Sequence, residues 1–298
     1  MPVLPPVAPR LFDRALLRQR QARAHAAARR GAASADFLLT RSAADVADRL
    51  DAILRNFDRA LDLGTPGNHF GEALAGRAGH GLTLRAGFCD SGARRDIAAD
   101  EESLPFADAS FDLIVSGLAL HTVNDLPGAL TQIRRALRPD GLFLAALLGG
   151  GTLRELRGAF AQAESEILGG ASPRVAPFAD IRDLGGLLQR AGFALPVTDL
   201  DTVTVRYADM FALMRDLRAM GATNCLTERS RKPLARAVLL RAADVYAERF
   251  ADADGRLRAT FDIAWLSGWA PHDSQPKPLK PGSAKASLEA AVKRVPKT

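Results

Sequence analysis

The segment LDLGTPGNHFGEAL, residues 61–74, carries residue types that can hold a nucleotide-like ligand. Asp62 comes just before Gly64, and a glycine there lets the chain turn sharply and lets a ligand approach the backbone. The helix expected to begin near Asn68 would direct its free N–H groups at that ligand. The dinucleotide pattern GxGxxG is absent, because Pro66 and Asn68 stand where glycines are expected. An ordinary turn that binds nothing is the plain alternative.

Two further stretches carry groups that could do chemistry. Asp100 and Glu101 begin the acidic stretch of residues 100–116, and a carboxylate beside the sheet edge can accept a hydrogen bond from an exocyclic amine such as that of adenine. His121 follows the strand expected at residues 111–120, where its imidazole could act as a general base or order a substrate. A solvated acidic loop and a packed histidine are the alternatives.

No metal site or disulfide framework is expected. The two cysteines, Cys89 and Cys225, are far apart and outside any CxxC spacing, which favours a reducing compartment. The five histidines form no H-x-D/E pattern of the kind that binds iron.

The elements that must position these groups alternate between strands and helices. Apolar runs predict strands at residues 59–63, 81–87, 111–120, 142–149, 198–207 and 257–270. Apolar residues at helical spacing predict helices at residues 11–30, 41–57, 69–78, 124–137, 152–168, 180–193, 208–220 and 229–250. This order predicts a doubly wound α/β sheet, in which ligands bind beyond the carboxyl ends of the strands.

Charge is concentrated near both ends of the chain. The 298 residues carry a net charge of +6, with arginines clustered in residues 10–30 and lysines in residues 277–297. Such ends can meet anionic lipid or an acidic protein face, although a solvated helix face and a soluble tail are the favoured explanation. No aromatic residues interleave with the basic ones, so we expect no nucleic-acid partner. No apolar run is long enough to span a membrane, and we expect a cytoplasmic protein, although the arginine-rich start also reads as an organellar transit peptide.

The order of the motifs resembles a known superfamily. A DLG turn, then LPFADASFDLIVS, then a helix leading to LRPDGLFLAAL resembles the class I S-adenosylmethionine-dependent methyltransferases. The segments GGGTLRELR, MFALMRDLRAMGATN and GWAPHDSQPKPLKPGSA are similar to the respiratory complex I assembly factor group of methyltransferase-like proteins. The resemblance implies a seven-stranded Rossmann-like methyltransferase sheet with N-terminal helices and a helical insertion before the last strand. The implied segments are N-terminal helices (1–56), the core (57–206), the insertion (207–256), the last strand (257–270) and a basic extended tail (271–298).

The resemblance also assigns S-adenosyl-L-methionine as cofactor and gives roles to individual residues. Proline removes a backbone donor from the turn, and Asn68 tolerates left-handed geometry at the third motif position. Where the family commonly shows Trp after its motif histidine, this chain has Thr122. The implied cofactor-binding residues are Asp62, Gly64, Gly67, Asn68, Asp90 for the ribose, Asp100 and Glu101 for the adenine, and Ser116 and Leu118 at the fourth strand; His121 is the catalytic candidate.

The implied function is action on a protein substrate, a subunit of respiratory complex I, during assembly of that complex. The reaction would be methyl transfer or the arginine hydroxylation in which the mitochondrial member of the group is implicated. Peripheral contact with the inner membrane through the basic ends is part of this expectation. Two alternatives stay open: a non-catalytic client-binding assembly factor with a degenerate cofactor site, and a small-molecule O-methyltransferase.

Overall fold

A seven-stranded mixed sheet forms the centre of the protein. The computed structural model describes residues 10–75, 82–88 and 96–276. Within them the strand order is β3-β2-β1-β4-β5-β7-β6, and only β7 runs antiparallel to its neighbours. The predicted doubly wound, seven-stranded sheet is therefore confirmed. The strands are β1 (Arg59–Leu63), β2 (Leu82–Gly87), β3 (Ile97–Ala98), β4 (Phe111–Gly117), β5 (Leu137–Leu148), β6 (Ala194–Tyr207) and β7 (Leu257–Trp269).

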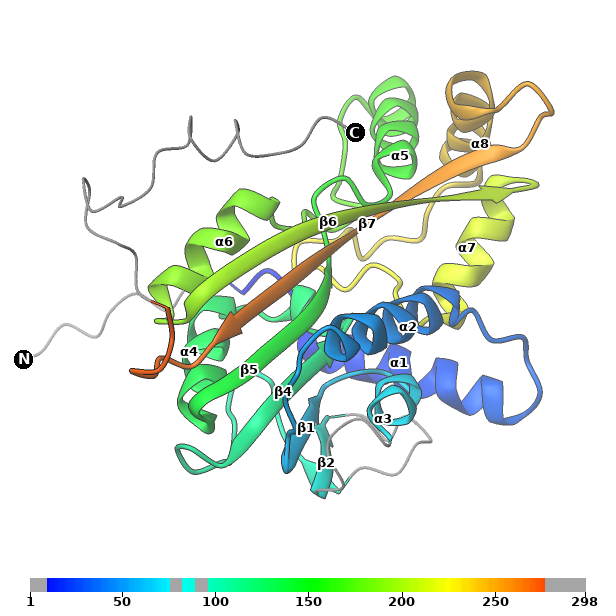
Figure 1. Ribbon diagram of the computed structural model, residues 1–298. Coiled ribbons are helices and arrows are strands. Elements are labelled where there is room, and N and C mark those ends of the chain that lie inside the picture. Colours follow the sequence, from blue (N-terminus) through cyan, green and yellow to red (C-terminus); the bar gives the residue numbers. More distant parts are fainter. Residues whose placement is uncertain (1–9, 76–81, 89–95, 277–298) are drawn as a thin grey trace, which may run out of the picture.

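Helices cover both faces of the sheet (Figure 1). One apolar core lies between the sheet and α2, α3, α5, α7 and α8, and a second core lies between the sheet and α4 with α6. None of the helices in the described part of the chain combines the length and the apolar character that crossing a bilayer requires. The helices are α1 (Arg14–Arg29), α2 (Phe37–Asp51), α3 (His69–Leu74), α4 (Leu126–Ala136), α5 (Arg154–Leu168), α6 (Ile181–Arg190), α7 (Met210–Ala219) and α8 (Arg236–Phe250), with a 3₁₀ turn at Leu120–Thr122.

The central strands are buried on both faces, as their continuous apolar sequences predict. In β4, Leu113 and Val115 belong to the first core, and Ile114 belongs to the second. This alternation follows from the two-residue period of a strand. The parallel pairing of β1 with β4 brings the carboxyl ends of these strands side by side at one edge of the sheet, and Asp62 lies opposite Val115 in this pairing.

The long strands β6 and β7 form an antiparallel ribbon that completes one side of the sheet next to β5 (Figure 1). The helices α7 and α8 lie between them in the sequence, which confirms the predicted helical insertion before the last strand. Two ion pairs tie the ribbon to α2: Arg41 to Asp201 at 2.8 Å and Arg49 to Asp199 at 2.7 Å.

Some local predictions were wrong. The two-residue strand β3 was not predicted, and the turn predicted at residues 138–141 lies inside β5, where Asp140 has a φ of +63°. The predicted apolar face of the first helix, formed by Leu11, Phe12, Ala15, Leu16, Ala22 and Ala26, is confirmed only for Phe12, which is buried just before the helix, and is wrong for the exposed Leu11, Ala15 and Ala22. In α1 the buried residue is Leu17, and Leu11 is exposed. The reason is that two arginines of α1 find carboxylate partners inside the protein, which sets the rotation of the helix.

Candidate functional site

A buried ion pair stabilises the turn after β1. The Asp62 side chain is fully buried, and its Oδ2 lies 3.3 Å from Nε of Arg85 on β2. Nη2 of Arg85 also donates a hydrogen bond to the carbonyl of Gly67. One guanidinium therefore joins the end of β1 to the turn that follows it. The pair engages the Asp62 carboxylate inside the protein, on the side of the neighbouring strand.

Two glycines of this turn have a positive φ, whereas the motif has three glycine positions. Gly64 has a φ of +74° and Gly67 a φ of +70°, a region that glycine enters at low cost. Asn68 has a φ of −116°, so the left-handed geometry considered for it is not adopted. Its amide instead donates to Oε1 of Glu72 at 2.9 Å, at the start of α3. The turn thus forms although Pro66 replaces a motif glycine.

Gly64 is also a point of close approach. A Cβ added there would lie 2.6 Å from Oε1 of Glu101 and 3.0 Å from the Cβ of Ala119. Any larger residue at position 64 would have to displace the Glu101 side chain. The backbone of the turn and the acidic loop after β3 therefore face each other across a narrow slot.

The end of β4 is locked to the same turn. Oγ1 of the buried Thr65 accepts a hydrogen bond from the backbone N–H of Gly117 at 2.8 Å. The next residue, Leu118, has a φ of +49°, a strained conformation of the kind that clusters at functional sites. The fully buried Ser116 hydroxyl has no hydrogen-bond partner within the described residues. The turn after β1 and the end of β4 are thus fixed relative to each other.

The acids predicted to face the adenine contact arginines of α1. Nη2 of Arg14 lies 2.8 Å from Oδ1 of Asp100 and also pairs with Glu101. Nη2 of Arg18 lies 3.1 Å from Oδ2 of Asp100, and its guanidinium stacks on the ring of Phe88. Glu101 is only 7% exposed. The slot bordered by Gly64, Glu101 and Phe88 retains a volume of about 30 Å³.

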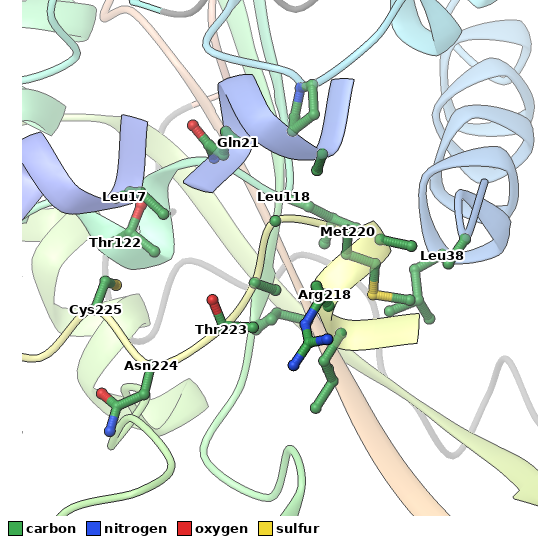
Figure 2. Close-up of a pocket in the computed structure, with 18 of the residues that line it drawn as sticks. Leu17, Gln21, Leu38, Leu118, Thr122, Arg218, Met220, Thr223, Asn224 and Cys225 are labelled. Carbon is green, nitrogen blue, oxygen red and sulfur yellow. The ribbon is translucent and has the colours of Figure 1, made fainter. Parts of the chain in front are cut away.

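A larger cavity of about 410 Å³ adjoins the slot. It begins at Pro66 and Gly67 and extends between α1, α2, α5 and the end of α7, with mostly apolar walls. Figure 2 shows Leu17 and Gln21 of α1 on one side of it and Arg218 with Thr223 on the other. This cavity has room for part of a second ligand next to the turn.

His121 lines this cavity, as its place after β4 predicted. Its ring meets the edge of Phe178 with 5.3 Å between the ring centroids. Burial lowers the pKa of His121 to about 4, so the imidazole is neutral at physiological pH. Its Nδ1 has no hydrogen-bond partner in the part of the chain that the structure describes. The neutral imidazole can accept a proton, but the lowered pKa makes it a weaker base than an exposed histidine.

The predicted residues fall into three groups. Gly64, Asp100 and Glu101 border the slot or its entrance. Gly67, Leu118 and His121 line the large cavity. Asp62 and Ser116 lie fully buried beneath them, Asn68 caps α3, and Asp90 lies outside the described residues. Across the described ranges no three His, Cys, Asp or Glu side chains are grouped so as to hold a metal ion.

Sequence reasoning missed several residues of the site. Arg14 and Arg18 are four residues apart, which places both on one face of a helix, and the acids at 100–102 were the complementary signal. His69 lines the cavity, and its Nε2 lies 3.2 Å from Oδ2 of Asp36. Arg85 could have been found from the sequence because it is an arginine within a short strand of the core.

Comparisons with known proteins agree on the fold and the family. A family model described as a methyltransferase domain matches residues 61–145. The chain is 41% identical over 286 residues to the Danio rerio protein named arginine-hydroxylase NDUFAF5, mitochondrial, covering 93% of this chain and 88% of that protein. It is 43% identical over 175 residues to the malonyl-[acyl-carrier protein] O-methyltransferase of Xylella fastidiosa (strain M23), covering 59% and 57%. The solved structure of YcgJ from Bacillus subtilis covers 78% of this chain and 99% of that chain with a TM-score of 0.51 at 14% identity, which shows a shared fold.

The Asp62–Arg85 pair predicts a strong, pair-specific effect on stability. Arg85→Met should lower the free energy of unfolding by about 3 kcal/mol, because it leaves a buried carboxylate without its guanidinium. The double variant Asp62→Asn with Arg85→Met should recover part of the loss. Urea unfolding measures both. The matched control is Arg49→Met, which removes an exposed pair and should cost no more than about 1 kcal/mol; equal losses in the two single variants would contradict the assignment.

His121 predicts a pH dependence of stability. Its pKa is about 4 in the folded protein against an ordinary value of 6.5, so between these values the unfolded chain binds more protons. The free energy of unfolding should therefore fall as pH falls through this window, by up to about 2 kcal/mol between pH 7 and pH 5. His121→Gln should remove this part of the pH dependence in urea unfolding. Parallel pH profiles of the two proteins would refute it.

Proposed function

Because the chain belongs to the family of the mitochondrial arginine-hydroxylase NDUFAF5 proteins, we propose that it modifies a protein substrate during the assembly of respiratory complex I. The substrate group would be an arginine side chain of a complex I subunit. The observation that carries the proposal is the pre-formed glycine turn that opens directly into a cavity of about 410 Å³. Similarity along nearly the whole chain, including the helical insertion that walls this cavity, supports it.

S-adenosyl-L-methionine is the cofactor that the methyltransferase domain and fold support. When bound, it supplies an electrophilic methyl group. The donor set fits it: Gly64 lets a ligand approach the backbone, and the Glu101 carboxylate faces that glycine. The turn and Leu118 would hold the methionine end, and Asp100 with Glu101 would meet the adenine. The open volume of the slot is smaller than such a ligand because Arg14 lies in it.

The residues of this chain would act on the acceptor in two ways. The apolar walls of the cavity, including Leu38, Leu156 and Phe160, exclude water from the acceptor. His121, which is neutral, would take a proton from an acceptor that carries one. The site is proposed in the cytoplasm, at the inner membrane where the basic ends would make peripheral contact; the NDUFAF5 relatives are named as mitochondrial proteins.

A second candidate function is O-methylation of a carboxylate on a small or carrier-bound molecule. It is favoured by the apolar character of the cavity together with the exposed Arg218 among its lining residues. A cation at the border of an apolar cavity suits an acceptor with an apolar chain and an anionic end better than it suits a guanidinium. The relative from Xylella fastidiosa carries the name of an enzyme of this type.

Gly64 provides the test of cofactor binding. Gly64→Ala should abolish binding of S-adenosylhomocysteine in titration calorimetry, because a Cβ there would lie 2.6 Å from Glu101 and the φ is +74°. Gly186→Ala is the matched control, since nothing lies within 4 Å of a Cβ at that position. Wild-type protein that stays silent at millimolar ligand would support the non-catalytic, client-binding alternative instead.

The acceptor is tested by mass spectrometry. The protein is incubated with S-adenosyl-L-methionine and with arginine-containing peptides of complex I subunits, or with malonyl-carrier protein. A peptide that gains one CH₂ group at arginine supports the first function as methyl transfer, and a gain of one oxygen atom, in a parallel incubation that also contains dioxygen and a reductant, supports it as hydroxylation. A methyl ester on the carrier supports the second function. His121→Gln should lower the rate by about 100-fold if the imidazole acts as the base. Transfer to lysine-substituted control peptides at the same rate would contradict arginine recognition.

A further inference from the structure

The acidic residues at the slot have a partner of their own before any ligand arrives. Arg14 is 12% exposed, contacts Asp100 and Glu101, and donates through Nη1 to the carbonyl of Thr122 at 3.4 Å. The Glu101 carboxylate is almost fully buried, and a buried carboxylate requires a cation or hydrogen-bond donors. In this structure the guanidinium of Arg14 meets that requirement.

Helix α1 is otherwise weakly packed against the protein. Of its 16 residues only Leu17 is buried. Beyond α1 the chain passes through Gly31, which has a φ of +86° and open space around it. At the other end, the Asp13 N–H donates to the Cys225 carbonyl at 2.8 Å. Few buried apolar contacts mean that a segment opens at low free-energy cost. The attachments of α1 include the contacts of Arg14, Arg18 and Leu17, the hydrogen bond from Nη1 of Arg20 to the Asn224 carbonyl, and the close packing of Gln21 against Gly221.

The same helix closes the large cavity. Leu17 and Gln21 line both the slot and the cavity of about 410 Å³. Figure 2 shows these two side chains facing the cavity from α1. A movement that withdraws Arg14 from the slot would also move Leu17 and Gln21, which lie on the same helix. Access to the two spaces is thus mechanically linked.

We propose that α1 is a latch: Arg14 and Arg18 compete with the adenosine half of the cofactor for Asp100 and Glu101. Cofactor binding then displaces the two guanidinium groups, lifts α1 and opens the cavity to the acceptor. In this exchange the carboxylates change their hydrogen-bond donor: the exocyclic amine of adenine replaces a guanidinium N–H. This inference rests on the proposed cofactor and adds the order of events: the cofactor binds first and the acceptor second.

Calorimetry with S-adenosylhomocysteine on the full chain tests the competition. The double variant Arg14→Ala with Arg18→Ala should bind about tenfold more tightly than wild type, a difference of about 1.4 kcal/mol, because no internal cation has to leave. Arg23→Ala with Arg29→Ala is the matched control: it removes two positive charges from exposed positions of the same helix and should bind as wild type does. Weaker or unchanged binding by the double variant would overturn the latch.

Limited trypsin digestion of the wild-type protein gives a second measurement that does not depend on the variants folding well. Added S-adenosylhomocysteine should speed cleavage within residues 14–23 by about threefold or more, because cleavage follows the population of the open segment. Slower or unchanged cleavage with ligand would mean that α1 closes over the cofactor, and the latch would be wrong. Absence of binding to wild type and to all variants would instead overturn the proposed cofactor, and the latch with it.

Discussion

A carboxylate that is fully buried at the end of β1 remains inside the protein because a guanidinium from the next strand reaches it. The Asp62–Arg85 pair is the constraint on which the site depends. The same guanidinium holds the Gly67 carbonyl, so the turn keeps its shape although Pro66 has removed one backbone donor. Thr65 then ties this turn to the end of β4. Slot, cavity wall and His121 all take their positions from this edge of the sheet.

Much of the fold could be predicted from the sequence, because burial on both faces leaves continuous apolar runs and helices leave a 3.6-residue period. β1 was predicted to the residue, whereas β3, with two residues, is too short to leave such a signal. The face of α1 could not be predicted from apolar spacing. Its rotation is set by Arg14 and Arg18, whose partners lie about 80 residues later in the chain, beyond the reach of a local pattern.

The candidate site, like the fold, could be predicted only in part from the sequence. The positions of Gly64, Glu101 and His121 follow from the order of motifs, because strand ends of a parallel sheet meet at one edge. What the sequence did not reveal is which groups face each other across that edge. Part of the basic N-terminal cluster is used inside the protein, so the net charge of +6 overstates what this segment offers to an outside partner. A polar slot and an apolar cavity side by side describe a site for two chemically different ligands.

The position of β7 has a consequence for the newborn chain. Strand β5 pairs with β7, and β7 pairs with β6, so the sheet is joined only when residues 257–269 have left the ribosome. Until then one edge of residues 142–148 of β5, which are all apolar, has no neighbour, and unpaired apolar edges promote aggregation. The wall of the cavity that contains Phe261 is also missing at that stage. The arrival of β7 is therefore the step that covers this strand edge and joins β6 to the rest of the sheet.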